Sequence, residues 1–255
     1  MESKMPHPIQ FFALIIGTEI LNQRRQDAHF KFVADILATK GYRLSGSFVI
    51  EDDPALIVKS LQFIASHPNP ILFSFGGIGS TPDDHTRKCA AIALKNGAFV
   101  LHQEAKQIIE ETLGEDAYPH PIKMAMLPKG AKLLKNPVNN MPAFSLDDRF
   151  FFMPGFPEMS HPMVTKIVEK LIPVAKKYVR YSLTALTKEN LFIELMEETP
   201  KGVEVSSLPK LLEEKKAWQT TISIASESAS LAKETFEKYL TLLEKNHIAY
   251  TLNDA

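Results

Sequence analysis

Two pairs of adjacent aspartates follow apolar segments of the sequence and carry its clearest chemistry. Asp52 and Asp53 follow the segment FVIE, and Asp83 and Asp84 follow the segment FSFGGIGSTP. Carboxylate oxygens are ligands that Mg2+ prefers, and a bound divalent cation also takes phosphate oxygens. Two close carboxylates repel an anion unless a cation lies between them. The sequence therefore predicts a divalent metal, Mg2+ before Mn2+ or Co2+, held by Asp83 and Asp84.

A glycine-rich segment, FGGIGSTP, lies directly before the second aspartate pair. Its glycines allow positive φ angles and keep side chains away from the backbone N–H groups, so these groups can point at phosphate oxygens. A helix expected to begin near Thr81 and Pro82 would add the positive end of its dipole. The spacing matches neither GxGxxG nor GxxxxGKS/T, so the segment alone is weak evidence for an anion site. The residues expected to bind ligand here are Gly76, Gly77, Gly79, Ser80 and Thr81.

Both aspartate pairs also have a structural interpretation. Asp53 precedes Pro54 in the pattern of a helix N-cap, which leaves Asp52 with less structural reason to be there. Thr81 and Asp84 have the spacing of a capping box, and a carboxylate in a first helical turn stabilises it by about 0.3 to 1 kcal/mol. Capping and ligand binding can coexist, so both interpretations stay open.

Apolar segments alternate with helix-period segments from residue 11 to about residue 177, which indicates a sheet wound with helices. The expected strands are FFALIIG, YRLSGSFVI, ILFSF, KMAMLPKGAKLL and RFFFMPG, with ILFSF apolar enough for a central strand. Ligands of such sheets bind outside the carboxyl ends of the strands. Gly17, Thr18 and Glu19 follow the first strand and are expected near this site, although an exposed loop acid is the simpler role for Glu19.

The pattern changes near Tyr178. The remaining chain offers a helix around KENLFIELMEE, strands at VEVSS, WQTTISIAS and IAYTL, and a helix with Ala232, Phe236 and Leu243 on one apolar stripe. We therefore expect two domains. Residues 1–177 form a three-layer α/β/α domain with a mostly parallel sheet, and residues 178–255 form a small α+β domain.

Composition narrows the classes of function. Lys and Arg number 29 against 30 Asp and Glu, so no broad basic surface for nucleic acid or an anionic membrane is expected. The single cysteine, Cys89, lies in an apolar pattern and is expected in the core. The first ten residues lack the apolar centre of a signal peptide, so we expect a cytoplasmic protein. The histidines lack metal-ligand spacing and are expected mostly at the surface or at caps, and no zinc, haem or flavin is expected.

Five segments, in their order and spacing, resemble the molybdopterin-binding (MoaB/Mog-like) domain family. They are IIGTEILNQRRQDAHFKFVADILATKGY, FVIEDDPALI, FSFGGIGSTPDDHTRKCAA, LPKGAKLLKN and FMPGFPEM, with GGIGSTPDDHT the most specific. Within the family the chain is most similar to the N-terminal branch of CinA, the competence/damage-inducible protein. The tail resembles the small domain that follows this module in CinA and in some eukaryotic FAD synthases.

The resemblance implies a three-layer α/β fold, a homodimer or homotrimer, and a cleft for a pterin or nucleotide at the glycine loop. Relatives in the CinA branch are described as metal-dependent pyrophosphatases of ADP-ribose and similar dinucleotides, and Mog-type relatives adenylylate molybdopterin. By position, Asp52 matches the catalytic-side acid of the family and Asp84 matches its ligand loop, so these two are the expected catalytic residues.

One segment departs from the family pattern. Where relatives read GTAPGF, this chain reads NNMPAF, in which Asn140 and Met141 replace small residues. Asn140 and Pro142 are expected to line the cleft. The leading hypothesis is a metal-dependent pyrophosphatase acting on ADP-ribose or a similar dinucleotide. The alternative, which NNMPAF favours, is a module that binds a nucleotide or pterin without turnover or serves as an oligomeric scaffold.

Overall fold

The structure is a computed structural model that describes residues 8–172, 177–213 and 217–253. The chain divides into two compact units, Met1–Val174 and Ala175–Ala255, and each unit has a hydrophobic core of its own. The two units are described separately. No helix in the described ranges is long and apolar enough to cross a membrane.

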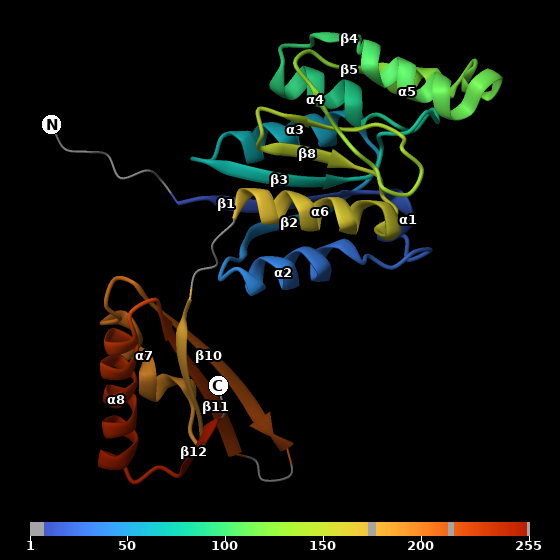
Figure 1. Cartoon of the computed structure of the whole chain (residues 1–255). Helices are drawn as coiled ribbons and strands as arrows, with labels where there is room; N and C mark the ends of the chain where they lie inside the picture. Colours follow the sequence, from blue (N-terminus) through green and yellow to red (C-terminus); the bar gives the residue numbers. More distant parts are fainter. Residues whose placement is uncertain (1–7, 173–176, 214–216, 254–255) are drawn as a thin grey trace, which may run out of the picture. The chain divides into compact units, whose positions relative to one another are not determined.

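The first unit contains a six-stranded sheet in the order β2-β1-β3-β8-β7-β6. Its first four strands in this order run parallel, and their arrows point to one edge in Figure 1. These strands are β1 (Gln10–Ile16), β2 (Leu44–Ile50), β3 (Pro70–Phe75) and β8 (Phe150–Met153). Every residue of β3 is buried, which confirms the prediction of a central strand covered on both faces.

Two further strands, β7 (Ala143–Leu146) and β6 (Lys132–Leu134), extend the sheet antiparallel to their neighbours. The segment KMAMLPKGAKLL, expected as one strand, instead supplies β6 and β5 (Met126–Pro128), which pairs with β4 (Phe99–Leu101) in a separate sheet. Gly130, with φ +82, turns the chain between them, a backbone conformation that L side chains rarely adopt. The prediction of a single strand here was therefore wrong.

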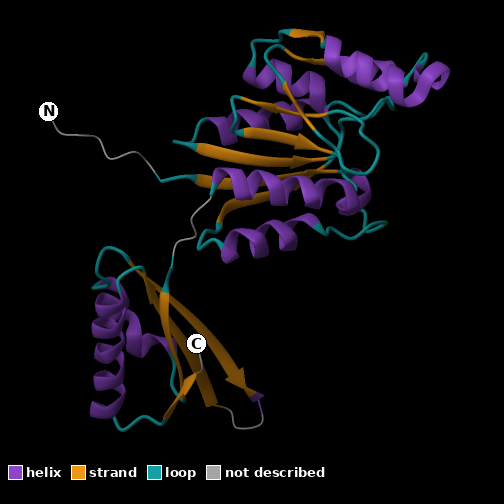
Figure 2. Cartoon of the chain, viewed as in Figure 1, coloured by secondary structure: helices purple, strands orange, loops and turns teal. Residues whose placement is uncertain are grey.

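Helices cover both faces of the large sheet, which gives three layers (Figures 1 and 2). On one face, the Phe32 ring stacks on His161 with centroids 3.8 Å apart. On the other, the Cys89 thiol donates to the carbonyl of Pro54 at 3.6 Å. The first pair of helices is α2 (His29–Thr39) and α6 (Pro157–Leu171), and the second pair is α3 (Pro54–Ala65) and α4 (Thr86–Leu94). This arrangement confirms the expected three-layer fold with a mostly parallel sheet.

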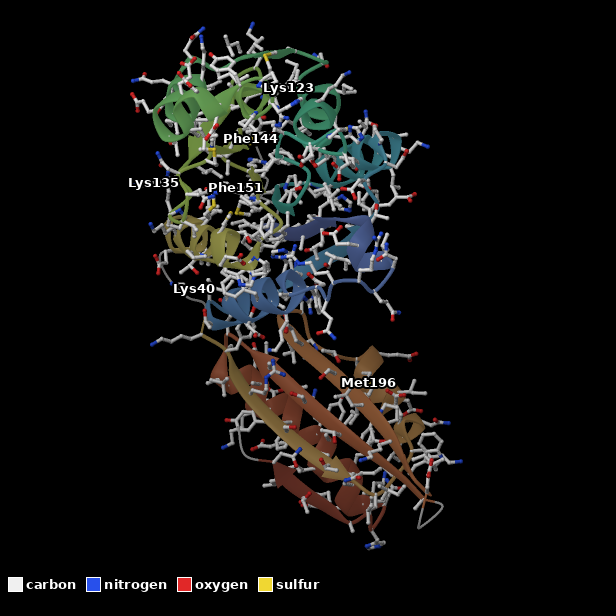
Figure 3. The ribbon with its side chains drawn as sticks, turned by 90° about the vertical axis from the view of Figure 1, so that its right-hand side faces the viewer. Lys40, Lys123, Lys135, Phe144, Phe151 and Met196 are labelled. Carbon is white, nitrogen blue, oxygen red and sulfur yellow. The ribbon has the colours of Figure 1, made fainter. Side chains whose placement is uncertain are left out.

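Aromatic side chains fill much of this core. Phe144 and Phe152 stack with centroids 4.7 Å apart, and Phe73 stacks on Phe151 at 6.0 Å. Figure 3 shows Phe144 and Phe151 within the first unit, where both are buried. A peripheral helix, α5 (Gln103–Leu113), begins at His102, whose ring accepts from the N–H of Ala105. The aromatic packing of the core holds the strand ends rigidly in place.

The second unit is the expected small α+β fold, a four-stranded antiparallel sheet in the order β10-β11-β9-β12. Helix α8 supplies Phe236 and Tyr239 to a core with Leu183, Ile222 and Ile224 of the sheet. The helix expected around KENLFIELMEE is a 3-10 turn followed by one short α-helix. The elements are β9 (Val179–Ala185), α7 (Ile193–Glu197), β10 (Val203–Leu212), β11 (Ala217–Ser226), α8 (Ala229–Lys245) and β12 (Tyr250–Asn253).

Candidate functional site

Three loops meet at the carboxyl edge of the large sheet. A short helix, α1 (Thr18–Leu21), follows β1 and lies at this edge in Figure 1. The N–H of Gly17 donates to the carbonyl of Ile50 at 3.0 Å, which ties the first loop to the end of β2. The N–H of Gly76 donates to Met153 at 3.0 Å, which ties the third loop to the end of β8. The edge therefore has the geometry at which open α/β sheets bind ligands.

Asp52 connects the first two loops. Its Oδ2 accepts from the N–H of Thr18 at 2.8 Å and from the Thr18 hydroxyl at 2.9 Å. The N–H of Asp52 donates back to that hydroxyl at 3.2 Å. The Glu19 carboxylate lies beside Gly17, since a Cβ on Gly17 would come within 2.9 Å of it. One oxygen of Asp52, Oδ1, has no hydrogen-bond partner among the described residues.

Asp84 is held by the glycine-rich loop itself. Its Oδ1 accepts from the N–H of Gly79 at 2.9 Å, and its Oδ2 accepts from the N–H of Thr81 at 2.7 Å. The Thr81 hydroxyl also donates to Oδ2. The loop amides thus bind an oxyanion, and that oxyanion is a carboxylate of the chain. This geometry explains why an anion-binding loop stands beside an acid.

The helix expected to begin near Thr81 and Pro82 begins later, at Thr86, with His85 in the N-cap position. The expected contact between Thr81 and Asp84 forms, but within a turn, because the Asp84 carboxylate holds the preceding amides out of helical geometry. Thr86 then fixes the loop, since its N–H donates to Gly77 at 2.9 Å and its hydroxyl donates to Gly76 at 3.0 Å. The predicted helix start was wrong.

The glycines of this loop are required by contacts within the protein. A Cβ on Gly76 would lie 2.2 Å from the carbonyl oxygen of Ile16, and one on Gly77 would lie 2.3 Å from the Thr86 hydroxyl. Both residues have positive φ, +95 and +66. A Cβ on Gly79 would lie 2.6 Å from the Asp84 carboxylate. These contacts fix the loop conformation, whereas the sequence had suggested close approach of a ligand.

Three amides of the loop stay available. The N–H groups of Gly77, Ile78 and Ser80 have no acceptor within the described part of the chain, although their neighbours at Gly79 and Thr81 hold Asp84. Unpaired backbone donors cost free energy unless water or a ligand satisfies them. Gly76 and Gly77 have positive φ, and successive backbone N–H groups after such residues can form a concavity suited to an anion.

Arg87 was not among the residues that the sequence suggested, yet it supports the loop from inside. Its side chain is 7% exposed and donates to the carbonyl oxygens of Gly79, Lys123 and Met126. Burial lowers its pKa, and the Asp84 charge opposes that shift. One signal was available, because Arg87 stands three residues before the buried Ala90 in the helix pattern.

The carboxylates of the candidate site suit a metal ion in only one binding mode. Asp83 is exposed, and a hydrogen bond from the Thr81 side chain lowers its pKa, so it stays ionised. The described residues contain no group of three or more His, Cys, Asp or Glu side chains able to hold a metal. Mg2+ often binds one or two carboxylates and takes its other ligands from water and phosphate, so Asp52 or the exposed Asp83 suits it only in that way.

The NNMPAF segment ends in the first residues of β7, which pair with the end of β8 and thus lie at the same edge. Asn140 is exposed with φ +57, and its N–H donates to the carbonyl of Asn136 at 3.2 Å. Pro142 is buried. Met141 packs against the hydrophobic core, so the bulk that replaces a small residue is accommodated there.

His29, expected at the surface or at a cap, is 2% exposed. Its ring stacks on Phe75 at 4.2 Å, and its Nε2 lies 3.3 Å from the carbonyl oxygen of Gly155. Burial lowers its pKa from the usual 6.5 to about 4, so the ring is neutral near pH 7. Gly155 approaches Gly76 so closely that a Cβ on it would lie 3.4 Å from the Gly76 Cα. His29 therefore packs against the end of β3, and Gly155 packs against the loop that follows it.

Fold and site together define an α/β domain with a glycine-rich, anion-binding loop at the carboxyl edge of its sheet. The model of the protein family described as "Probable molybdopterin binding domain" matches residues 12–174. The chain belongs to this molybdopterin-binding family.

Relatives place the chain within the CinA-like part of the family. It is 31% identical over 166 residues to the CinA-like protein of Syntrophotalea carbinolica. The match covers 63% of this chain and 39% of that protein. The chain thus matches less than half of that relative. It is 27% identical over 214 residues to a protein of Caldivirga maquilingensis, over 76% of this chain and 82% of that protein.

A solved structure has the same fold. The crystal structure of CinA from Thermoplasma acidophilum, a protein of unknown function by its description, matches with a TM-score of 0.57 and 25% identity. The match covers 64% of this chain and 98% of that one. The similarity to CinA that the motifs indicate is confirmed by these comparisons.

Proposed function

We propose that the first unit binds the phosphate group of a nucleotide or pterin at the carboxyl edge of its sheet. This proposal rests on the loop after β3, whose amides at Gly79 and Thr81 hold a carboxylate, while those at Gly77, Ile78 and Ser80 have no acceptor among the described residues. A phosphate has several acceptor oxygens, so it can satisfy these three donors together.

The charges of the site decide how the phosphate is held. Asp52 and Asp83 lie on loops of this edge and repel a bare phosphate. A divalent cation between carboxylate and phosphate oxygens removes that repulsion, and Mg2+ with several waters suits two carboxylates. We therefore expect binding to be tighter with Mg2+, Mn2+ or Co2+ present.

Metal-dependent hydrolysis of a diphosphate linkage, as in ADP-ribose, is the second candidate function. It is favoured by the free oxygen of Asp52 and by the exposed, ionised Asp83. A divalent metal supplies charge neutralisation and lowers the pKa of bound water. Asp52 and Asp83 would hold the cation, and Asp84, whose two oxygens are occupied, would act by positioning the loop.

Calorimetric titration tests the binding proposal. AMP, ADP-ribose and dihydroneopterin triphosphate are titrated into the protein with and without Mg2+. Saturable heat that depends on Mg2+ supports the proposal, and Asp52→Asn should weaken the effect of the metal. The absence of saturable heat for all three ligands would overturn it and leave an oligomeric scaffold, whose expected homodimer or homotrimer is measured by sedimentation.

Hydrolysis is tested separately with ADP-ribose and FAD in the presence of Mg2+, Mn2+ or Co2+. An enzyme should lose turnover on chelation of the metal and in Asp52→Asn, by on the order of a hundredfold or more. Asp53→Asn is the matched control, because Asp53 caps α3 by accepting from the N–H of Leu56 at 2.7 Å. Binding without product in any metal would reject the enzyme and retain the binding module.

A further inference from the structure

An exposed aromatic ring stands at the same edge as the phosphate loop. Phe156 is 51% exposed, although it directly follows Gly155, on which a Cβ would lie 3.4 Å from the Cα of Gly76 in the loop. Its backbone is fixed, because its carbonyl oxygen accepts from the N–H groups of Met159 and Ser160, both at 3.0 Å. The ring therefore has a defined place beside the loop and is not buried by the chain.

A cation covers this ring. The guanidinium of Arg25 lies 5.2 Å from the centroid of Phe156, a cation–π contact. The N–H of Arg25 donates to the carbonyl of Glu19 at 3.0 Å, so the arginine is anchored to the loop after β1. Within the described residues no carboxylate lies within ion-pair distance of Arg25. The cation thus lacks an anionic partner.

A hollow of about 440 Å³ adjoins the arginine. It is lined by Ile20, Gln23, Arg25, Gln26 and Asp27. The lining offers the amide groups of Gln23 and Gln26, which can hydrogen-bond to the edge of a ring, whereas both carboxylate oxygens of Asp27 accept from backbone N–H groups of α2. A planar nitrogen heterocycle needs these features, namely an aromatic face for stacking and polar groups at its edge.

We propose that Phe156 is the stacking platform for the planar heterocycle of the ligand, and that Arg25 leaves the ring on binding to pair with the ligand phosphate. The inference rests on the proposed function, since it places the heterocycle of the same phosphate-bearing ligand. A purine and a pterin share the required chemistry, a flat aromatic ring with hydrogen-bonding edges. Phe156 then contributes selectivity for ligands with a ring, and Arg25 contributes affinity for the phosphate.

Matched ligand pairs test the platform on the whole protein. AMP and ribose 5-phosphate differ by the purine, and dihydroneopterin triphosphate and tripolyphosphate differ by the pterin arm. Phe156→Leu removes stacking but keeps apolar bulk, and it should weaken binding of the ring-bearing member by about 5-fold to 100-fold. The ring-free member should bind Phe156→Leu as it binds the original protein. Phe156→Tyr is the conservative control and should restore affinity for the ring.

Arg25→Gln tests the second role, the contribution of Arg25 to affinity for the ligand phosphate. It should weaken both members of each pair by the same factor, because both carry the phosphate. Equal affinity of Phe156→Leu and the original protein for AMP and for dihydroneopterin triphosphate would overturn the platform while phosphate binding stands. An equal loss for ring-bearing and ring-free ligands would overturn it as well. Failure of the original protein to bind any of the four would overturn both the platform and the phosphate site. If only one ring-bearing ligand responds, that ligand identifies the heterocycle.

Discussion

At the scale of single residues, the carboxylate of Asp84 governs the candidate site. It accepts from two backbone N–H groups and a hydroxyl, and the buried Arg87 reaches the same loop through the carbonyl of Gly79. The neighbouring Asp83 makes no comparable set of contacts and faces solvent. Two adjacent aspartates of identical chemistry thus have different roles, one structural and one available for a cation.

This difference predicts the effect of two matched substitutions. Asp84→Ala leaves the donors at Gly79 and Thr81 without their acceptor and should lower the free energy of unfolding by about 2 to 4 kcal/mol. Asp83→Ala should change it by less than about 0.5 kcal/mol. Urea unfolding followed by circular dichroism measures both values. Equal effects of the two changes would contradict the role assigned to Asp84.

The buried His29 predicts a pH dependence of stability. Its pKa is about 4 in the folded chain and 6.5 when unperturbed, so between these values the unfolded chain binds a proton that the folded chain does not. Stability should therefore fall as the pH drops from 6.5 towards 4, by up to about 3 kcal/mol from this residue. His161, whose pKa burial also lowers, adds to the effect in the same direction.

His29→Phe keeps a ring against Phe75 and removes the titrating group. The loss of stability between pH 6.5 and pH 4 should be smaller in this variant, as measured by urea unfolding at several pH values. An unaltered slope in His29→Phe would show that other groups cause the pH dependence.

At the scale of elements, the loop between β3 and α4 is shaped by its close approach to two neighbours. Gly76 contacts the end of β1 at the carbonyl of Ile16, and Gly77 contacts the start of α4 at Thr86. The loop can therefore present its remaining amides at a fixed place on the edge of the sheet. Rigid elements position ligand-binding groups better than mobile loops do.

A comparison of glycines tests this packing. Gly76→Ala places a Cβ 2.2 Å from a backbone oxygen that cannot move freely, so it should cost well over about 3 kcal/mol. Gly97 has φ +78 and open space around its Cβ position, so Gly97→Ala should cost only the conformational strain of about 1 to 2 kcal/mol. Thermal unfolding measures the difference. Similar costs at the two positions would mean that the positive φ, and not the close contact with Ile16, is the reason for glycine at position 76.

The strands and helices of the sheet domain follow from local pattern, and the loops do not. The apolar segment ILFSF predicts the buried β3, and Asp53 with Pro54 predicts the start of α3, because both signals are local. The start of α4 was predicted too early, since Asp84 finds partners in its own loop and stops the helix from forming there. The division of the KMAMLPKGAKLL segment depends on a pairing partner distant in sequence, because β5 pairs with β4.

The site residues show the same division. The sequence predicts which loops lie at the edge, because parallel strands place their carboxyl ends together. It does not predict that Asp84 is held by amides or that Arg87 is buried beneath them, since those contacts depend on loop conformation. The exposure of the Phe156 side chain to solvent also depends on the fold and is not predicted by the sequence pattern.

At the scale of the whole molecule, each unit has its own core. The core of the first unit includes residues from β1 to α6, and that of the second includes residues from β9 to α8. All residues assigned to the candidate site and to the ring platform belong to the first unit. Ligand binding should therefore be a property of the first unit alone.

Truncation after residue 174 tests this assignment. The shortened chain should unfold in a single cooperative transition and should bind AMP with the affinity of the whole chain, within about threefold. Circular dichroism and calorimetry provide the two measurements. A folded first unit with strongly reduced affinity would assign part of the ligand site to the second unit.

The proposed binding mode has the loop after β3 hold phosphate through the amides that do not bind Asp84. Nuclear magnetic resonance of the backbone amides during titration with AMP and Mg2+ tests this mode. We expect the largest amide shifts at Gly77, Ile78 and Ser80, with smaller changes at Gly79 and Thr81, which stay bonded to Asp84. If AMP saturates the protein while the resonances of those three amides do not shift, the proposed binding mode is contradicted.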